Sequence, residues 1–84
     1  MYELVFDDKA IDFINKLPKH LRERVYNKII KTKENPLRYF KRLAERTDYK
    51  LRIGDYRVIA DINVSSKRIE ITVIGHRKNV YDKS

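Results

Sequence analysis

The chain has 84 residues, of which 20 are Lys or Arg and 12 are Asp or Glu, giving a net charge of +8 and a pI near 9.8. A chain of this length has room for one core only, so we expect a single domain over residues 1–84. The absence of cysteine excludes disulfides and thiolate chemistry. No apolar run approaches the roughly 18 residues that span a bilayer, and the N-terminus lacks a basic leader, so we expect a cytoplasmic protein with no membrane partner. The excess of positive charge is typical of a protein that binds nucleic acid, an acidic protein or an anionic surface.

The N-terminal half predicts one strand and two helices. Residues 2–6 are rich in β-prone side chains, and the two aspartates that follow are good helix caps. Apolar residues recur at helical spacing over residues 9–17, and Pro18 suits the first turn of a second helix. In that helix apolar residues recur every four positions until Asn35 and Pro36, which we expect to end it. The pattern indicates a short antiparallel helix pair.

The C-terminal half predicts a meander of strands. Residues 37–48 show no clean period and are expected to form a connection. Apolar residues then alternate with polar ones over residues 49–53, 56–62 and 69–73. A turn at residues 65–66 would set Val58 opposite Val73 and direct the apolar side chains of all three strands to one face.

These elements predict the fold class α+β. The N-terminal strand and the antiparallel helix pair would pack on one face of a mostly antiparallel sheet of about four strands, because the helices and the sheet each have one apolar surface to bury. The other face of the sheet would stay open. We expect Ile59, Ile74 and His76 to lie on this open face.

The first strand pair sets three cations side by side on the open face. If Gly54 and Asp55 form a two-residue turn, Arg52 falls directly opposite Arg57, and Lys50 lies one step along the same face. Like charges that face each other across a strand pair are destabilising. A small protein that accepts this arrangement is expected to bind an anion there.

The cluster has the parts of a metal-independent ribonuclease, for which no cofactor is expected. Arg52, Arg57 and Arg77 would donate several hydrogen bonds to a phosphate that gains charge in the transition state. Lys50 is the candidate to take a proton from a ribose hydroxyl, and Tyr81 can exchange a proton or stack on a base. For each cation taken singly, a merely solvated surface remains the simpler interpretation.

Two further residues near the C-terminus are candidates for contact with RNA. His76 is a side chain whose ionisation changes near neutral pH, and Lys78 follows it in the basic tail. Exposed apolar residues on the open face, Ile59 and Ile74, could receive an acidic, partly apolar segment that folds on binding and covers the cations.

Two motifs carry a resemblance that spans essentially the whole chain. Tyr-Arg-Val-Ile at residues 56–59, and Gly-His-Arg at residues 75–77 followed by Val-Tyr at residues 80–81, resemble the RelE toxins of the RelE/ParE superfamily. These toxins belong to type II toxin–antitoxin systems. The resemblance implies an mRNA interferase that enters the ribosomal A site and cuts the codon there. It also implies a cognate RelB-like antitoxin that holds the toxin inactive in a hetero-oligomer.

The resemblance also implies roles for five residues. Lys50 or Arg52 would assist removal of the 2′-hydroxyl proton, Arg57 and Arg77 would stabilise the phosphorane, and Tyr81 would orient or protonate. Two departures bear on proton transfer: Arg52 stands where some relatives have lysine, and Tyr81 lies closer to Arg77 than in some relatives.

Two other functions stay open at this point. The first is a non-enzymatic inhibitor of DNA gyrase that resembles ParE, although relatives of that kind generally lack the full basic set. The second is a basic nucleic-acid-binding module without catalysis, whose binding would fall steeply with salt.

Overall fold

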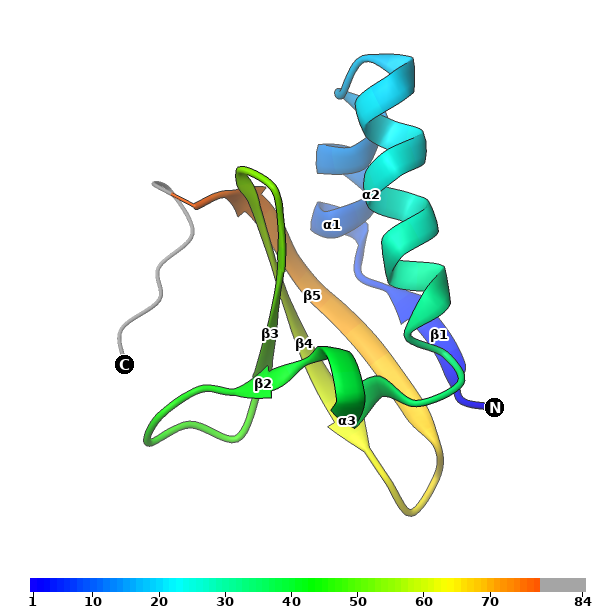
Figure 1. Ribbon diagram of the computed structural model, residues 1–84, viewed down its shortest axis with the longest axis vertical. Helices are drawn as coiled ribbons and strands as arrows, with labels where there is room; N and C mark the ends of the chain where they lie inside the picture. The colour runs from blue at the N-terminus through cyan, green and yellow to red at the C-terminus, as the bar shows by residue number, and fades with distance from the viewer. Residues whose placement is uncertain (78–84) are drawn as a thin grey trace.

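The computed structural model describes residues 1–77 of the chain, which form a sheet with two helices on one face and a short third helix near its lower edge in the view shown (Figure 1). In chain order the elements are β1 (Glu3–Phe6), α1 (Asp8–Asn15), α2 (Lys19–Lys31), α3 (Pro36–Tyr39), β2 (Lys41–Arg42), β3 (Tyr49–Ile53), β4 (Tyr56–Asn63) and β5 (Arg68–His76). The α+β class is confirmed. Among these elements, no helix is long and apolar enough to cross a bilayer.

The sheet has five strands in the order β1-β5-β4-β3-β2. β1 runs parallel to β5, and the other neighbouring pairs are antiparallel. The strand that the sequence pattern does not indicate is β2, which has two residues and lies within the segment expected to be a simple connection. It pairs with the outer edge of β3. The mostly antiparallel sheet is therefore confirmed, with one more strand than the sequence pattern indicates.

The helices cover one face of the sheet because each has an apolar stripe at helical spacing. Ala10 and Ile14 of α1 are buried one turn apart, as are Val25 and Ile29 of α2. They form a single core with buried residues of the three long strands, which are Leu51, Ile53, Tyr56, Val58, Ala60, Ile69, Ile71 and Ile74. The predicted packing of the helix pair on the sheet is confirmed.

The second helix ends earlier than expected, at Lys31 rather than at Asn35. Thr32 is fully buried, and its backbone N–H and its hydroxyl both donate to the carbonyl oxygen of Ile29, at 3.0 and 2.6 Å, so that the last turn closes and the buried hydroxyl has a partner. Pro36 then begins α3, where a missing backbone N–H costs nothing. The Asn-Pro pair therefore marks the start of a short helix rather than the end of the long one.

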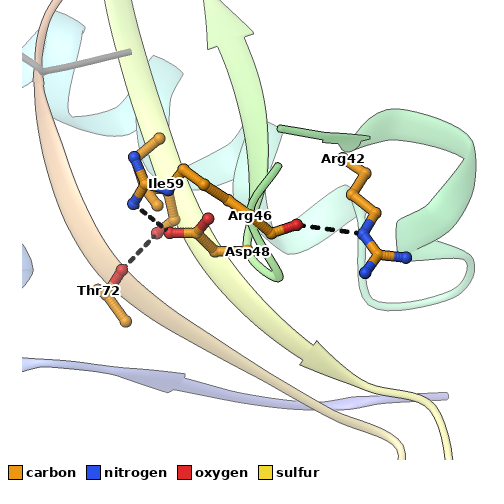
Figure 2. A network of polar contacts seen from close by, with 5 residues as sticks. All are labelled: Arg42, Arg46, Asp48, Ile59 and Thr72. Atoms are coloured by element: carbon orange, nitrogen blue, oxygen red, sulfur yellow. Dashed lines mark hydrogen bonds and ion pairs between the residues drawn. The ribbon is translucent and has the colours of Figure 1, made fainter. Parts of the chain in front are cut away.

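The predicted register between the last two strands is correct up to Ala60 and wrong beyond it. Ala60 lies opposite Ile71, as expected, but a β-bulge adds Thr72 before the next pair. The Thr72 hydroxyl donates a hydrogen bond of 3.2 Å to the Ile59 carbonyl oxygen (Figure 2). Val58 consequently faces Ile74 rather than Val73.

The bulge moves the end of β5 to the other face from the one expected. Ile74 is 5% exposed and belongs to the core under the helices, and His76 packs against the rings of Tyr56 and Phe13 on the same side. The expectation that Ile74 and His76 lie on the open face is therefore wrong. Val73 takes a place on that face instead, where it is 43% exposed.

The open face is also less open than expected, because the segment between β2 and β3 covers part of it. Leu43, which is 2% exposed, packs on Ile59, which is 3% exposed, and the two form a small cluster separate from the main core. Ile59 is thus not an exposed apolar residue. An incoming partner segment cannot reach it without displacing Leu43.

Candidate nucleic-acid interface

The hairpin of β3 and β4 builds the centre of the candidate site. Gly54 has φ +56°, a left-handed conformation that favours glycine, and it forms the turn with Asp55. Arg52 and Arg57 are paired across the two strands as predicted, and both point away from the helices. Arg52 is exposed and Arg57 is half-buried. The structure thus brings the two guanidinium groups to the same face at the same register position.

A further cation extends this cluster across the sheet. Lys50 pairs with Lys41 of β2 on one side and with Ile59 of β4 on the other, so Lys41 and Lys50 share the open face. Neighbouring strands are about 4.8 Å apart, and successive residues on one face of a strand are about 6.7 Å apart. Four cations therefore form a compact two-row patch, the cationic face, made of Lys41, Lys50, Arg52 and Arg57.

Lys41 could not be predicted as a site residue from the sequence pattern, because a two-residue strand is too short to show a periodicity. Its only signal is a Lys-Arg pair in an aperiodic segment, and such pairs are common on solvated surfaces. The pairing of β2 with β3 joins residues seven and nine positions apart across an irregular segment, and no periodicity in that segment indicates it.

The C-terminal candidates divide between the two sides of the hairpin turn. The backbone N–H of Arg77 donates a hydrogen bond of 2.9 Å to the carbonyl oxygen of Asp55, which fixes the Arg77 backbone beside the turn that joins the strands of Arg52 and Arg57. His76 lies on the helix side, with its ring centroid 4.8 Å from that of Tyr56. Lys78 and Tyr81 lie outside the described residues. The structure therefore brings Arg77 to the hairpin and directs His76 away from the cationic face.

The segment between β2 and β3 forms a small polar network beside the cationic face. Arg46 forms an ion pair of 2.6 Å with Asp48, and the Nε of Arg42 donates a hydrogen bond of 3.3 Å to the Arg46 carbonyl oxygen. Figure 2 shows the Arg46 side chain extending toward β4, beside the carboxylate of Asp48. Together with Leu43, this network limits the cationic face on the side of the β2–β3 segment.

The open face is acidic further along β4. Asp61 pairs with Glu70, and a hydrogen bond to Asp7 together with the negative charge of that carboxylate raises the pKa of Glu70 above its ordinary value of 4.5. Asp7 precedes α1 at the N-cap position but makes no side-chain capping hydrogen bond. Asp61 follows Arg57 by four residues, or about 13 Å along the strand. The face is thus polarised, with cations near the turn and carboxylates away from it.

The arrangement can bind phosphate. Guanidinium groups donate planar, multidentate hydrogen bonds to phosphate oxygens, and a second phosphate of the same strand can lie over the lysine row. The carboxylates repel a polyanion and limit its path to the turn end of the sheet. Within residues 1–77, no group of three or more His, Asp or Glu residues lies close enough together to hold a metal ion.

The fold is that of known bacterial and archaeal toxins. The RelBE2 toxin–antitoxin complex of Mycobacterium tuberculosis contains a chain with 25% sequence identity and a TM-score of 0.79, over 90% of this chain and 98% of that one. The RelE–RelB complex of the archaeon Pyrococcus horikoshii matches with 23% identity and a TM-score of 0.77, over 94% and 98% of the two chains. The isolated RelE toxin of E. coli matches with 23% identity and a TM-score of 0.76, over 90% and 84%.

The family follows from the sequence itself. Residues 4–81 match the family model described as the ParE toxin of the type II toxin–antitoxin system parDE, so the chain belongs to this family. Together with the RelE-like structures, the match identifies a type II toxin of the RelE/ParE superfamily. The resemblance stated from the sequence is confirmed at this level. A search of curated protein sequences found no match.

Proposed function

We propose that the protein is an mRNA interferase, a metal-independent endoribonuclease that cuts mRNA in the ribosomal A site and so inhibits translation. The observation that carries the proposal is the cross-strand pair of Arg52 and Arg57, with Lys50 in the next row of the same face. Facing cations cost stability in the free protein. A phosphate bound between them would turn this cost into binding energy, most strongly when it gains charge in the transition state.

In the proposed reaction the ribose 2′-hydroxyl oxygen forms a new bond to the adjacent phosphorus. The bond from phosphorus to the 5′-oxygen of the next nucleotide breaks, which leaves a 2′,3′-cyclic phosphate and a 5′-hydroxyl. Lys50 or Arg52 would assist removal of the 2′-hydroxyl proton, while Arg57 and Arg77 would stabilise the charged phosphorane. Tyr81 would orient the substrate or protonate the leaving oxygen. His76 and Lys78 are further candidates for RNA contact, but the ring contacts of His76 place it on the far side of the turn.

We further propose that a RelB-like antitoxin binds and inhibits the protein in a hetero-oligomer. Several of the similar structures are toxin–antitoxin complexes, including those of M. tuberculosis and P. horikoshii. An acidic segment would be attracted to the cationic face, and the exposed Val73 offers it an apolar contact on the same side of the sheet. Masking Arg52 and Arg57 in this way would keep RNA out.

A second candidate function is inhibition of DNA gyrase without catalysis. It is favoured by one observation, which is that the matching family model describes ParE toxins. The two functions require different properties of the cationic face. An endoribonuclease needs the arginine pair for the chemical step, whereas a gyrase inhibitor needs a protein contact surface and no phosphate clamp.

One experiment separates the two candidates. Purified protein is added to ribosomes stalled on a defined mRNA with an empty A site, and new 5′ ends are mapped. Arg52→Ala should lower the cleavage rate by about 10²- to 10³-fold, the usual loss when one transition-state donor is removed. Arg38→Ala removes the same charge from an exposed position on α3 and is the matched control. No cleavage by the unmodified protein, with gyrase supercoiling inhibited instead, would favour the second candidate.

A further inference from the structure

One flank of α2 is basic along its whole length. Four exposed residues share this flank at positions i, i+4, i+8 and i+11, and they are His20, Arg24, Lys28 and Lys31. At 1.5 Å per residue the flank extends about 16 Å. We call these four residues the α2 flank. It lies next to the buried stripe of Val25 and Ile29 and contains no apolar side chain.

The other flank of α2 has a different character. Tyr26, which is 45% exposed, and Ile30 line a cavity of about 540 Å³ together with Leu4 and Phe6 of β1 and Ile11 of α1. Such a concave, partly apolar surface suits a protein segment. A row of exposed basic side chains with no apolar side chain among them suits a phosphate backbone, because protein partners need apolar burial to bind stably.

The α2 flank reaches the hairpin turn of the candidate site. A methyl group placed on the Cα of Gly54 would lie 3.3 Å from a terminal guanidinium nitrogen of Arg24, so this side chain packs directly on the turn. Figure 1 shows the turn between β3 and β4 at the same end of the molecule as α1 and the N-terminal half of α2. The turn is therefore a junction between the helix layer and the open face of the sheet.

Cations consequently follow one another around the edge of the molecule. Arg52 and Arg57 lie on the open side of the hairpin, Arg77 is held at the turn by its bond to Asp55, and Arg24 packs on the turn from the helix side. Lys28 and Lys31 continue the series along α2. The carboxylate of Asp55 stands at this junction, and its single charge offsets only part of theirs.

We propose that the α2 flank is a second binding surface for RNA backbone, continuous with the cationic face around the turn at Gly54. The inference rests on the proposed function, in which the cleaved strand lies on the cationic face and structured ribosomal RNA surrounds it. The α2 flank then holds a neighbouring RNA segment that is not cut. Arg24 and Lys28 act as positioning residues, whose contribution is to affinity rather than to the chemical step.

The test compares two double variants with the same loss of charge. Arg24→Gln/Lys28→Gln removes two cations of the α2 flank, and Lys9→Gln/Lys16→Gln removes two exposed cations in and just after α1. Each lowers the net charge from +8 to +6. Binding to ribosomes with an empty A site is measured as a function of salt, and mRNA cleavage is measured as a function of toxin concentration. Thermal unfolding followed by circular dichroism checks that both variants fold.

The α2 variant should bind about tenfold more weakly, and its slope of log K against log salt should be shallower by about 1.4–1.8, the loss of two phosphate contacts. The defect in cleavage should appear in the apparent KM and not in kcat. Equal slopes for the α2 variant and the α1 variant would overturn the inference, as would weaker binding to an acidic antitoxin peptide without any change in ribosome binding. An unmodified protein that binds ribosomes without cutting mRNA would refute the proposed function, and the comparison of slopes would still decide the inference.

Discussion

For the facing arginines at the hairpin we predict that one and the same substitution raises the stability of the fold and lowers the proposed activity. Arg52→Gln should stabilise the fold, because Arg52 is exposed and its charge lies directly opposite that of Arg57. The same substitution should abolish most of the proposed cleavage. Residues that bind a charged substrate commonly lower the stability of the protein without substrate. The pair of Arg52 and Arg57 allows this loss of stability to be measured.

The size of the effect follows from the geometry of the strand pair. Side chains opposite each other in an antiparallel pair have Cβ atoms about 5 Å apart, which places the two charges about 6 Å apart. In water this separation gives a repulsion of about 0.7 kcal/mol. Screening reduces it to about 0.6 kcal/mol at 0.01 M salt, about 0.3 at 0.15 M and about 0.1 at 1 M. For a domain of this size the melting temperature should rise by about 2–5 °C at low salt.

The assay is thermal unfolding at three salt concentrations. A matched substitution is included for which the expected change in melting temperature has the opposite sign. Arg68 on β5 lies between Asn63 of β4 and Glu3 of β1, so Arg68→Gln removes an attraction and should destabilise slightly. Both effects should shrink as salt rises. If Arg52→Gln lowers the melting temperature, or raises it equally at 0.01 M and 1 M salt, repulsion between the arginines is not what the substitution relieves.

Three further predictions concern the rest of the open face. Glu70→Gln should raise the melting temperature at pH 7, because the pKa of Glu70 is raised in the folded protein, and ionising this carboxyl beside Asp7 therefore lowers the free energy of unfolding. The gain should shrink as the pH falls and vanish well below pH 4.5, where Glu70 is protonated in both the folded and the unfolded chain; an equal gain at pH 7 and at this low pH would contradict the prediction. Lys41→Ala should make the salt dependence of RNA binding shallower by about 0.7 while changing the unfolding free energy by less than about 0.5 kcal/mol, and an unchanged slope would remove Lys41 from the site. Leu43→Ala should cost about 2–3 kcal/mol in urea unfolding, because Leu43 is 2% exposed against Ile59, and a cost under about 0.5 kcal/mol would show that this segment does not bury Ile59 in solution.

The candidate site shows what local patterning can and cannot predict. The pairing of Arg52 with Arg57 was predictable because it depends on neighbouring residues only: a Gly-Asp turn and an apolar period of two on each side. The position of Lys41 was not, because β2 acquires its pairing from β3, nine residues further along the chain at Lys50. The roles of Lys50, Arg52, Arg57, Arg77 and Tyr81 remain predictions.

The error at the end of β5 has an equally physical origin. Ile71, Thr72, Val73 and Ile74 are all β-prone, and no turn residue among them marks where an extra residue enters the strand. A prediction from the sequence therefore continues the period of two through the position where the structure has the bulge. The folded protein has the bulge at Thr72, and beyond it Ile74 joins the core under the helices and the exposed His76 lies on the helix side of the sheet.

The sequence by itself determined the class of the fold, the helix pair, the β3–β4 hairpin and the row of cations on its open side, because each depends on periodicity and turn chemistry within a few residues. The tertiary structure alone decided that β1 joins the sheet beside β5, that Leu43 covers Ile59, that His76 leaves the cationic face and that Arg24 packs on Gly54. These four contacts join residues from 16 to more than 60 positions apart. Their outcome depends on how distant surfaces pack together, a free energy to which local sequence preference contributes little.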